Sequence, residues 1–389
     1  MTAKRAYDVI IVGCGSVGVP SAYHLAAKGF KVLALESRSS VGQGDAKAAI
    51  GGVRATHSDP AKILLCKESL QEMCTWKEVH GVDIGWKPGG YCFPVYDEKV
   101  EATLKGILPK QKSFGLNIDW IDADGIAEVV TGVERENLRG GTYSPEDGQV
   151  SPLKSSVAYY RAACEHGAEF RFFTPVTGYL REGDRVIGVK TPEGDIHAGH
   201  VVLATGSDAA EHGKLLGINI PVQPDSHEAG VTMPLEQFLK PLVVDLRPGP
   251  EGKTVNFYFG QCAEGAITFC YSPKELFKGT NRESTSEFLP ILARRMISLI
   301  PRLRHVLIRR VWRGCYPMTP DGLIILDNVP SIPGLTLAVG MCGQGFMLGP
   351  GVGMNVVSLI TEGKTLLPPE VQAGIRLDRD YGQAKEALK

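Results

Sequence analysis

The feature that most constrains the fold of this chain is a glycine cluster directly behind a short apolar run. Residues 7–12 (Tyr-Asp-Val-Ile-Ile-Val) are mostly apolar and β-branched, which is typical of a buried parallel strand. Residues 13–18 follow with the spacing Gly-x-Gly-x-x-Gly, and a helical pattern covers residues 17–28. A second apolar run, 31–35, ends at Glu36. This order of strand, glycine turn, helix, strand and acid predicts a βαβ unit that binds a dinucleotide.

The three glycines and the acid each have a physical role in such a unit. Gly13 permits the tight turn, Gly15 lets the backbone approach a pyrophosphate, and Gly18 allows close packing of helix on strand. The pyrophosphate then lies at a helix N-terminus, where free N–H groups and the helix dipole favour negative charge. We expect Glu36 to accept hydrogen bonds from the adenosine ribose. The expected cofactor contacts in this unit are Gly13, Gly15, Ser16, Val17, Gly18, Glu36, Ser37 and Arg38.

Two later segments favour FAD over NAD as the dinucleotide. Residues 201–206 (Val-Val-Leu-Ala-Thr-Gly) predict a second buried strand that ends in glycine, as in flavoproteins. Residues 340–349 are glycine-rich and separate a predicted strand, 335–340, from a terminal apolar helix, 351–361. Backbone N–H groups there would stabilise the negative charge that develops near N1 and O2 of a flavin on reduction. The further expected cofactor contacts are Val176, Ala204, Thr205, Gly206, Gly343, Gly345, Phe346 and Met347.

Strands of the parallel type at both ends of the chain, with different material between them, predict a discontinuous domain. The predicted fold class is α/β, with a Rossmann-type FAD-binding domain and an inserted α+β substrate domain on a mostly antiparallel sheet. Helices are expected over 60–79, 151–166 and 286–299, whereas residues 37–59 lack periodicity. The predicted FAD-binding domain comprises 1–88, 145–220 and 320–375, the substrate domain 89–144 and 221–319, and the C-terminal tail 376–389.

Composition and charge exclude several classes of partner. The 389 residues carry a formal net charge of −1, so neither nucleic acid nor an anionic membrane is expected to bind. No apolar run is long enough to span a bilayer, and no signal region is visible. Nine cysteines without a Cys-x-x-Cys pair favour a reducing compartment, so we expect a cytoplasmic protein. His197 and His200 lack a nearby third ligand, and no metal is expected.

Several motifs together make the chain similar to one family of flavoproteins. The chain resembles the amino-acid oxidase family, in the branch that holds sarcosine oxidase, glycine oxidase and the flavin subunit of archaeal proline dehydrogenase. The Thr-Pro-Asp-Gly stretch at 319–322, together with the glycine-rich terminal segment, makes the resemblance specific. The segments that carry it are 13–18 with Glu36, 50–54 (Ile-Gly-Gly-Val-Arg), 201–206, 312–321 (Trp-Arg-Gly-Cys-Tyr-Pro-Met-Thr-Pro-Asp) and 343–345.

The resemblance implies an activity. In this family an amine is oxidised by hydride transfer from the carbon beside nitrogen to flavin N5, and the imine is then hydrolysed. A small secondary amine or amino acid such as glycine, sarcosine, proline or iminodiacetate is the expected substrate. The alternative is a flavin subunit that passes electrons to a partner subunit, and a homo-oligomer is also compatible. A third alternative, an NAD-binding reductase, is disfavoured by residues 340–349.

The resemblance also implies how the substrate carboxylate is held. Arg54 matches an arginine that holds this carboxylate in sarcosine oxidase, and a guanidinium can form two hydrogen bonds with it. The alternative is that Arg54 only fixes its loop. Met347 stands where sarcosine oxidase has a lysine that shares this duty, so another cation must compensate or the pocket differs. Arg309 and Arg313 are candidates for that cation, with a structural or surface role as the alternative.

Tyrosines and histidines supply the other candidate substrate contacts. Tyr316 matches an aromatic residue of the family segment, and Tyr258 lies on a strand expected to face the pocket. Either tyrosine can form a hydrogen bond with substrate or serve only in packing. His57 and His227 are candidates for control of substrate protonation, with a purely structural role as the alternative. The residues expected to act on substrate are therefore Arg54, Tyr258, Tyr316 and Met347.

Two properties of the flavin site follow less directly from the resemblance. Cys315 lies near the position of the flavin-linked cysteine of monomeric sarcosine oxidase, but alignment on 319–321 places Gly314 there, so we expect non-covalent FAD. An oxidase of this family needs a cation that activates oxygen, usually a lysine. Thr268 falls near that position, and Lys274 cannot be assigned to it. The sequence therefore leaves oxidase and dehydrogenase open.

Overall fold

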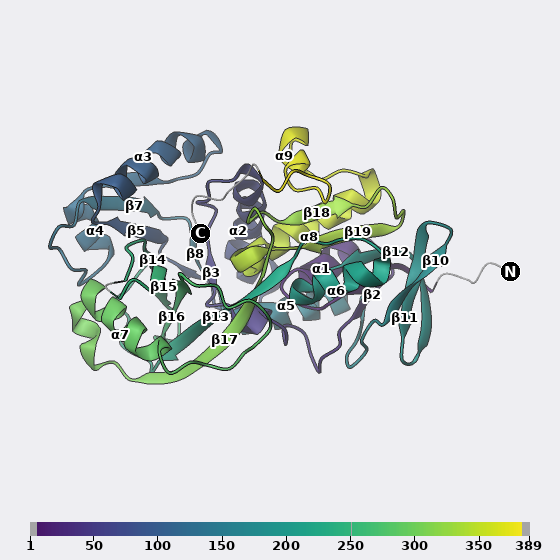
Figure 1. The fold of residues 1–389 in the computed structure, drawn as a ribbon, viewed down its shortest axis with the longest axis horizontal. Helices are drawn as coiled ribbons and strands as arrows, with labels where there is room; N and C mark the ends of the chain where they lie inside the picture. The colour runs from purple at the N-terminus through teal and green to yellow at the C-terminus, as the bar shows by residue number, and fades with distance from the viewer. Residues whose placement is uncertain (1–5, 250, 383–389) are drawn as a thin grey trace.

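The computed structural model describes residues 6–249 and 251–382. Two eight-stranded sheets lie side by side, one on the right of Figure 1 with the N-terminal strands and one on its left. A small third sheet contains β3 (Gly52–Val53), β8 (Gly148–Gln149) and β4 (Lys87–Pro88). The α/β class that the sequence predicts is thereby confirmed.

The first sheet brings together strands from both ends of the chain. Its centre is β1, which pairs in parallel with β2 on one side and β12 on the other. β12 pairs in parallel with β19 in turn, although about 130 residues separate them in sequence. The strands are β10 (Gly178–Glu182), β11 (Arg185–Thr191), β12 (Gly194–Leu203), β1 (Tyr7–Val12), β2 (Val32–Leu35), β9 (Glu169–Arg171), β18 (Ile325–Asn328) and β19 (Leu335–Val339).

Helices cover this sheet, and glycines allow two of them to approach closely. α8 (Gly345–Glu362) packs on α1 (Gly18–Ala27) and on α2 (Pro60–His80). A Cβ at Gly349 would lie 1.8 Å from the Ser16 carbonyl oxygen. The sequence predicts that the terminal helix begins at residue 351, whereas α8 begins at Gly345, six residues earlier. The glycine-rich sequence looked like a loop, but its glycines serve close packing between helices.

The second sheet is built from two separate stretches of chain, within residues 91–144 and 223–318. Every described pairing in it is antiparallel except that of β14 with β5. In spatial order its strands are β17 (Ile308–Met318), β13 (Gln223–Thr232), β16 (Ile267–Pro273), β15 (Thr254–Gln261), β14 (Leu242–Asp245), β5 (Tyr91–Val95), β7 (Gly140–Ser144) and β6 (Asp119–Ile121). The division of the chain into an FAD-binding and a substrate domain stays a prediction.

The remaining helices lie around the two sheets. α5 and α7 match the helices expected from the sequence, whereas α3 and α4 had not been assigned. Of the predicted C-terminal tail, residues 383–389 lie outside the described part of the chain. These helices are α3 (Glu98–Ser113), α4 (Ala123–Val129), α5 (Pro152–Glu165), α6 (Ala209–Leu216), α7 (Phe288–Leu299) and α9 (Pro369–Ala373), with short 3-10 turns η1 (Ala46–Ala48), η2 (Gly206–Asp208), η3 (Pro301–His305) and η4 (Cys342–Gln344).

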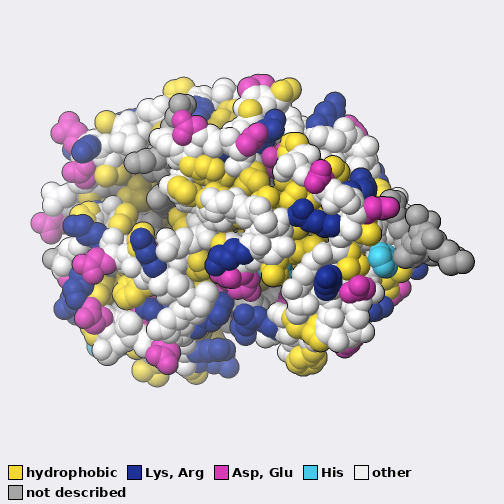
Figure 2. Space-filling view, turned by 45° about the vertical axis from the view of Figure 1, so that its right-hand side comes forward, with side chains coloured by type: hydrophobic (Ala, Val, Ile, Leu, Met, Phe, Trp, Pro, Cys, Tyr) yellow, Lys and Arg dark blue, Asp and Glu magenta, His cyan; other side chains and the backbone are white. Residues whose placement is uncertain are grey.

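The surface carries both signs of charge. On the face in Figure 2, acidic and basic side chains are interspersed over most of the surface, and several basic side chains gather low on the face. Apolar side chains reach the surface near its middle. Among the described residues, no helix is long and apolar enough to cross a membrane.

Candidate functional site

A cavity of about 510 Å³ lies where the carboxyl ends of the first sheet meet the second sheet. Its walls include Val12 and Leu35, the last residues of β1 and β2, and Val339, the last residue of β19. Strands β13, β15, β16 and β17 contribute the opposite end. The carboxyl edge of a parallel sheet is where ligands of open α/β folds bind. The volume is within the range of small-molecule sites.

The glycine turn gives the cavity a helix N-terminus. Gly13 has φ +99°, and a Cβ there would lie 2.5 Å from the Ala204 carbonyl oxygen. A Cβ at Gly18 would lie 1.9 Å from the Gly13 carbonyl oxygen, whereas one at Gly15 would meet no atom within 4 Å. The first turn of α1 contains no acidic residue, and Val17 makes no side-chain cap. The free N–H groups of this turn therefore suit an anion.

Glu36 is held beside this turn by backbone donors. Its carboxylate accepts hydrogen bonds from the N–H of Cys14 at 3.0 Å and the N–H of Arg38 at 2.9 Å. The Ser37 hydroxyl lies 3.3 Å away. Glu36 is buried and lines the cavity together with Val176, which belongs to a separate segment. The carboxylate is thus fixed at the end of β2, where a ribose of a bound dinucleotide would lie.

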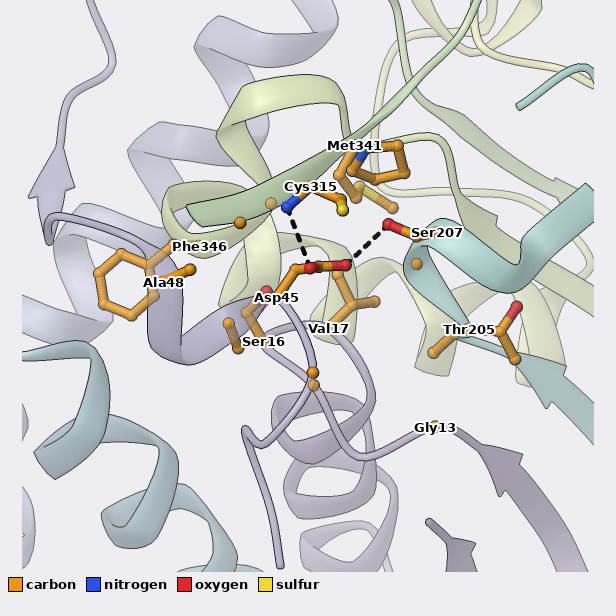
Figure 3. Close-up of a pocket in the computed structure, with 18 of the residues that line it drawn as sticks. Gly13, Ser16, Val17, Asp45, Ala48, Thr205, Ser207, Cys315, Met341 and Phe346 are labelled. Atoms are coloured by element: carbon orange, nitrogen blue, oxygen red, sulfur yellow. Dashed lines mark hydrogen bonds between the residues drawn. The ribbon is translucent and has the colours of Figure 1, made fainter. Parts of the chain in front are cut away.

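Asp45 lines the cavity and connects segments that are far apart in sequence (Figure 3). Its carboxylate accepts from the Ser207 hydroxyl at 2.7 Å and from the backbone N–H of Cys315 at 3.0 Å. The Arg282 guanidinium lies 2.7 Å from the same carboxylate. Arg38 and Arg282 are the lysine or arginine residues that line the cavity in the described part of the chain. Asp45 therefore forms an ion pair with one of these two residues, Arg282.

The end formed by the second sheet is rich in aromatic side chains. The hydroxyls of Tyr258 and Tyr316 lie 2.6 Å apart and share a hydrogen bond. Burial raises the pKa of both phenols well above the usual value, so both remain protonated at neutral pH. The His227 ring stacks on the Tyr316 ring with a centroid distance of 3.9 Å. Two phenols that share one hydrogen bond have one further hydroxyl proton to donate, and the Cys270 thiol is a hydrogen-bond partner of both phenols.

The predicted carboxylate anchor does not line the cavity. Arg54 is 5% exposed and lies behind it, with its guanidinium carbon 5.9 Å from the Tyr91 ring centroid and 5.6 Å from that of Phe93. Its guanidinium also donates to the carbonyl of Thr56. Tyr91 itself lines the cavity. The role of Arg54 stays a prediction.

The two other candidate cations occupy different positions. Arg313 is buried and forms an ion pair with Glu228 at 3.0 Å, and the Glu228 carboxylate also accepts from the backbone N–H of Thr285. Arg309 is exposed on β17. Neither lines the cavity. The Arg313 pair therefore connects β13 and β17 to the loop at Thr285.

Only one of the two candidate histidines lines the cavity. His227 lines it, whereas His57 is fully buried outside it, with Nε2 3.6 Å from the Cys66 sulfur. Burial and the nearby Arg54 hold the pKa of His57 well below its usual value. His200 lies 2.7 Å from the Thr336 hydroxyl inside the first sheet. Only His227 of these three can meet a ligand in the cavity.

The sequence places Cys315 near the position for flavin attachment and Thr268 near the position for oxygen activation. Cys315 and Gly314 both line the cavity. Burial, together with the Asp45 carboxylate, raises the pKa of the Cys315 thiol to about 11, so little thiolate is present at neutral pH. The Thr268 hydroxyl donates to the Ile50 carbonyl at 3.2 Å, and Lys274 does not line the cavity.

The structure thus brings together nearly all the predicted site residues. Every expected cofactor contact lines the cavity except Gly18, whose part is the close packing described above, and Tyr258, Tyr316 and Met347 line it as well. Sequence reasoning missed Asp45, Ser207, Cys270 and Arg282, which also line it. No spacing signal could have found Asp45 and Arg282, because they meet across 237 residues.

Comparison with known proteins identifies the family. The model of the family described as FAD dependent oxidoreductase (DAO) matches residues 8–359. The chain belongs to this family. It is an FAD-dependent oxidoreductase, and its cofactor is FAD.

Solved structures of similar proteins cover almost the whole chain. The L-proline dehydrogenase from P. horikoshii is 30% identical with a TM-score of 0.88, and the match covers 95% of this chain and 96% of that one. A glycine oxidase from Geobacillus kaustophilus is 25% identical with a TM-score of 0.83, over 96% and 99% of the two chains.

Curated relatives are similar at lower identity. The bifunctional protein ThiO/ThiG of a Nostoc species is 27% identical over 92% of this chain, which spans 53% of that protein's length. The hydrogen cyanide synthase subunit HcnC of Pseudomonas aeruginosa is 24% identical over 92% of this chain and 93% of its own length. These relatives carry the names of proteins with different activities.

The residues of the cavity fit FAD. The α1 N-terminus offers unpaired N–H groups to a pyrophosphate, the open space at Gly15 admits it, and the Glu36 carboxylate suits a ribose. A bound FAD would supply the acceptor for two electrons and a proton.

Proposed function

We propose that this protein oxidises the C–N bond of a small amino acid or secondary amine of the glycine, sarcosine, proline or iminodiacetate type. Hydride leaves the carbon beside nitrogen for flavin N5, and the resulting imine is hydrolysed. The observation that carries the proposal is the continuity of one cavity from the glycine turn at Gly15 to the tyrosine pair Tyr258–Tyr316. The similarity to a proline dehydrogenase and a glycine oxidase over nearly the whole chain supports it.

In this proposal, the two sheets have different tasks. The first sheet holds the dinucleotide, as a discontinuous Rossmann-type domain, and the second sheet forms the inserted substrate domain. The unshared hydroxyl proton of the Tyr258–Tyr316 pair donates to the substrate carboxylate. Phe346 and Met347, which lie in the first turn of α8, form an apolar wall that limits water around the reacting carbon. The protein's contribution is orientation of the C–H bond and exclusion of water.

A second candidate is a dehydrogenase that passes its electrons to a partner subunit rather than to oxygen. Two observations favour it. No lysine lines the cavity in the described part of the chain, and Thr268 is bonded to the Ile50 carbonyl. Relatives include proteins named as subunits, such as HcnC and sarcosine oxidase subunit beta. In this alternative, the reduction of the flavin by substrate is the same and only its reoxidation differs.

Anaerobic reduction of the flavin, followed by exposure to air, tests both candidate functions. The purified protein with FAD is mixed without oxygen with glycine, sarcosine, proline and iminodiacetate in turn, and loss of the flavin absorbance is recorded. We expect at least one of the four to bleach the flavin. Air is then admitted, and rapid return of the absorbance indicates an oxidase, whereas slow return that an artificial acceptor accelerates indicates a dehydrogenase. A flavin that none of these amines reduces, in a protein with full FAD content, would contradict the proposed substrate class.

A further inference from the structure

An ion pair between Asp45 and Arg282, here called the clasp, connects segments that the two sheets contribute to the cavity. The Arg282 guanidinium lies 2.7 Å from the Asp45 carboxylate, and both residues line the cavity. Asp45 belongs to the segment that follows β2 of the first sheet, whereas Arg282 belongs to the segment between β16 of the second sheet and α7. Figure 3 shows the Asp45 carboxylate bonded also to the Ser207 hydroxyl and the Cys315 N–H. One carboxylate thus holds three separate parts of the cavity wall together.

The segment that carries Arg282 is an exposed strap, residues 274–287. It runs from the end of β16 to the start of α7 as an irregular loop. Its residues are exposed except Gly279 and Thr285, which are half-buried. A segment with so little buried surface opens at a small cost in free energy. Long irregular segments in compact proteins often serve as lids over ligand sites.

Two attachments hold the strap to β13. At the first, the Gly279 N–H donates to the Pro224 carbonyl at 2.8 Å. At the second, the N–H and the hydroxyl of Thr285 each donate to the Glu228 carboxylate at 2.6 Å. Arg282 lies between these two points in the sequence. The clasp therefore fastens the part of the strap that neither attachment holds.

The clasp lies where the cavity reaches the solvent. A residue that both lines a cavity and is exposed stands at its mouth. The Arg282 side chain is 35% exposed, and Leu215 of α6 is 50% exposed, and both line the cavity. Asp208 and Glu211 are exposed and line it as well. The mouth is therefore bounded by the strap and by the η2–α6 segment, to which Ser207, a partner of the clasp, belongs.

We propose that the Asp45–Arg282 clasp closes the entrance through which FAD reaches its site. The cofactor is FAD, and its site at the glycine turn belongs to the same cavity. With the clasp formed, the strap is fixed to the opposite side of the mouth. With the clasp broken, the strap moves on its two attachments and the mouth widens. Because the clasp forms between protein groups, it restricts entry and exit of FAD alike. The inference concerns the cofactor and does not depend on the substrate proposed above.

Rates of FAD association and release test the clasp without any substrate. Arg282→Gln and Asp45→Asn each remove one charge and keep a side chain of similar shape. A mouth that opens more often admits and releases FAD faster by the same factor. Both rate constants should therefore rise about fivefold, the largest effect expected from loss of a partly exposed ion pair, and Kd should stay unchanged. Association with FAD-free protein and release on dilution are both followed by flavin fluorescence.

The association rate separates this gating from electrostatic steering. The pyrophosphate of FAD is negatively charged, so loss of a positive charge by itself slows the approach of the cofactor. Faster association with Arg282→Gln therefore cannot arise from steering. The matched control is Lys253→Gln, which removes a positive charge from an exposed ion pair with Glu287 at the end of the strap, outside the cavity. Its rate of FAD release should equal that of the native protein.

A double variant shows whether the two residues act as one contact. If they do, Arg282→Gln combined with Asp45→Asn should accelerate FAD exchange no more than either change alone. The melting temperature of each FAD-free variant is measured to establish that it is folded. Faster release alone, with a higher Kd, would overturn the proposal and make Arg282 a contact of the cofactor. Native rates in both single variants, or the same acceleration in Lys253→Gln, would overturn it as well.

Discussion

The two ends of the cavity are built by different means. The end at β1 and β2 is made largely of backbone: a glycine turn, the N–H groups at the start of α1, and a carboxylate, Glu36, that two backbone N–H groups hold. The end at the second sheet is made of side chains, with Tyr258, Tyr316 and His227 projecting from three strands. The first end comes from about thirty consecutive residues, and the second from segments almost 90 residues apart.

The difference explains what each end can recognise. Backbone donors and a helix dipole bind a pyrophosphate whatever the neighbouring side chains are, so the first end suits a cofactor that many proteins share. Side chains that project from a sheet can change one at a time without altering the strands. The second end is therefore where relatives of different activity are expected to differ.

The largest effect that we expect concerns the second end. If Arg54 anchors the substrate carboxylate, Arg54→Ala should weaken substrate binding by about 2–5 kcal/mol, as for loss of one partner of a buried charge pair. Arg54→Lys should also bind poorly, because a point charge cannot form a two-pronged contact. FAD occupancy should remain unchanged. The measurement is the apparent affinity for substrate and for an analogue with a neutral group in place of the carboxylate.

Arg54 contacts Tyr91 and does not line the cavity, so this prediction tests the contrast between the two ends of the cavity. A large loss would mean that the second end rearranges when substrate binds, so that Arg54 reaches it. If Arg54→Ala still prefers the carboxylate substrate, the anchor lies elsewhere, and the Tyr258–Tyr316 pair is the next to vary. A fall in melting temperature without any change in this preference would assign Arg54 to packing against Tyr91 and Phe93.

An intermediate effect is expected at the first end. Glu36→Ala removes the acceptor for the ribose, and one charge-assisted hydrogen bond contributes about 1.5–3 kcal/mol, so FAD affinity should fall roughly tenfold or more. Glu36→Gln retains the shape and one acceptor oxygen and should lose less. Affinity is measured by titrating FAD into protein from which it has been released. Unchanged affinity in Glu36→Ala would show that the ribose lies elsewhere.

The smallest effects that we expect distinguish two glycines of the Gly-x-Gly-x-x-Gly motif. A Cβ at Gly18 would lie 1.9 Å from the Gly13 carbonyl oxygen, so Gly18→Ala should lower the free energy of unfolding by about 1–3 kcal/mol, as overpacking does. A Cβ at Gly15 would meet nothing within 4 Å, so Gly15→Ala should leave the melting temperature of the FAD-free protein unchanged. It should nevertheless weaken FAD binding, because the methyl group would occupy space that the pyrophosphate needs.

The pair of glycine variants has a clear contradicting result. If Gly15→Ala binds FAD as tightly as the native protein does, the pyrophosphate does not approach the turn at that residue. The first end would then hold the cofactor through other contacts than its backbone, and the contrast between the two ends would weaken.

The sequence predicted the first end almost completely. The strand, turn and helix at 7–28 are local structures, whose residues must have their types and spacing for the backbone to turn and pack. The same reasoning failed at 345–350, where glycines typical of a loop lie inside α8 because Gly349 packs on the backbone of Ser16. Local sequence cannot show which neighbour a glycine approaches.

The sequence by itself therefore determined the α/β class, the dinucleotide turn and the family, because these depend on contiguous residues and on backbone geometry. Only the tertiary structure decided which side chains meet at the second-sheet end of the cavity. It placed Arg54 behind Tyr91 rather than in the cavity wall, and it placed His227 rather than His57 there. The contact of Asp45 with Arg282 had no signal in the sequence. The physical reason is that contacts between distant strands and loops depend on sheet order and register, which no local pattern encodes.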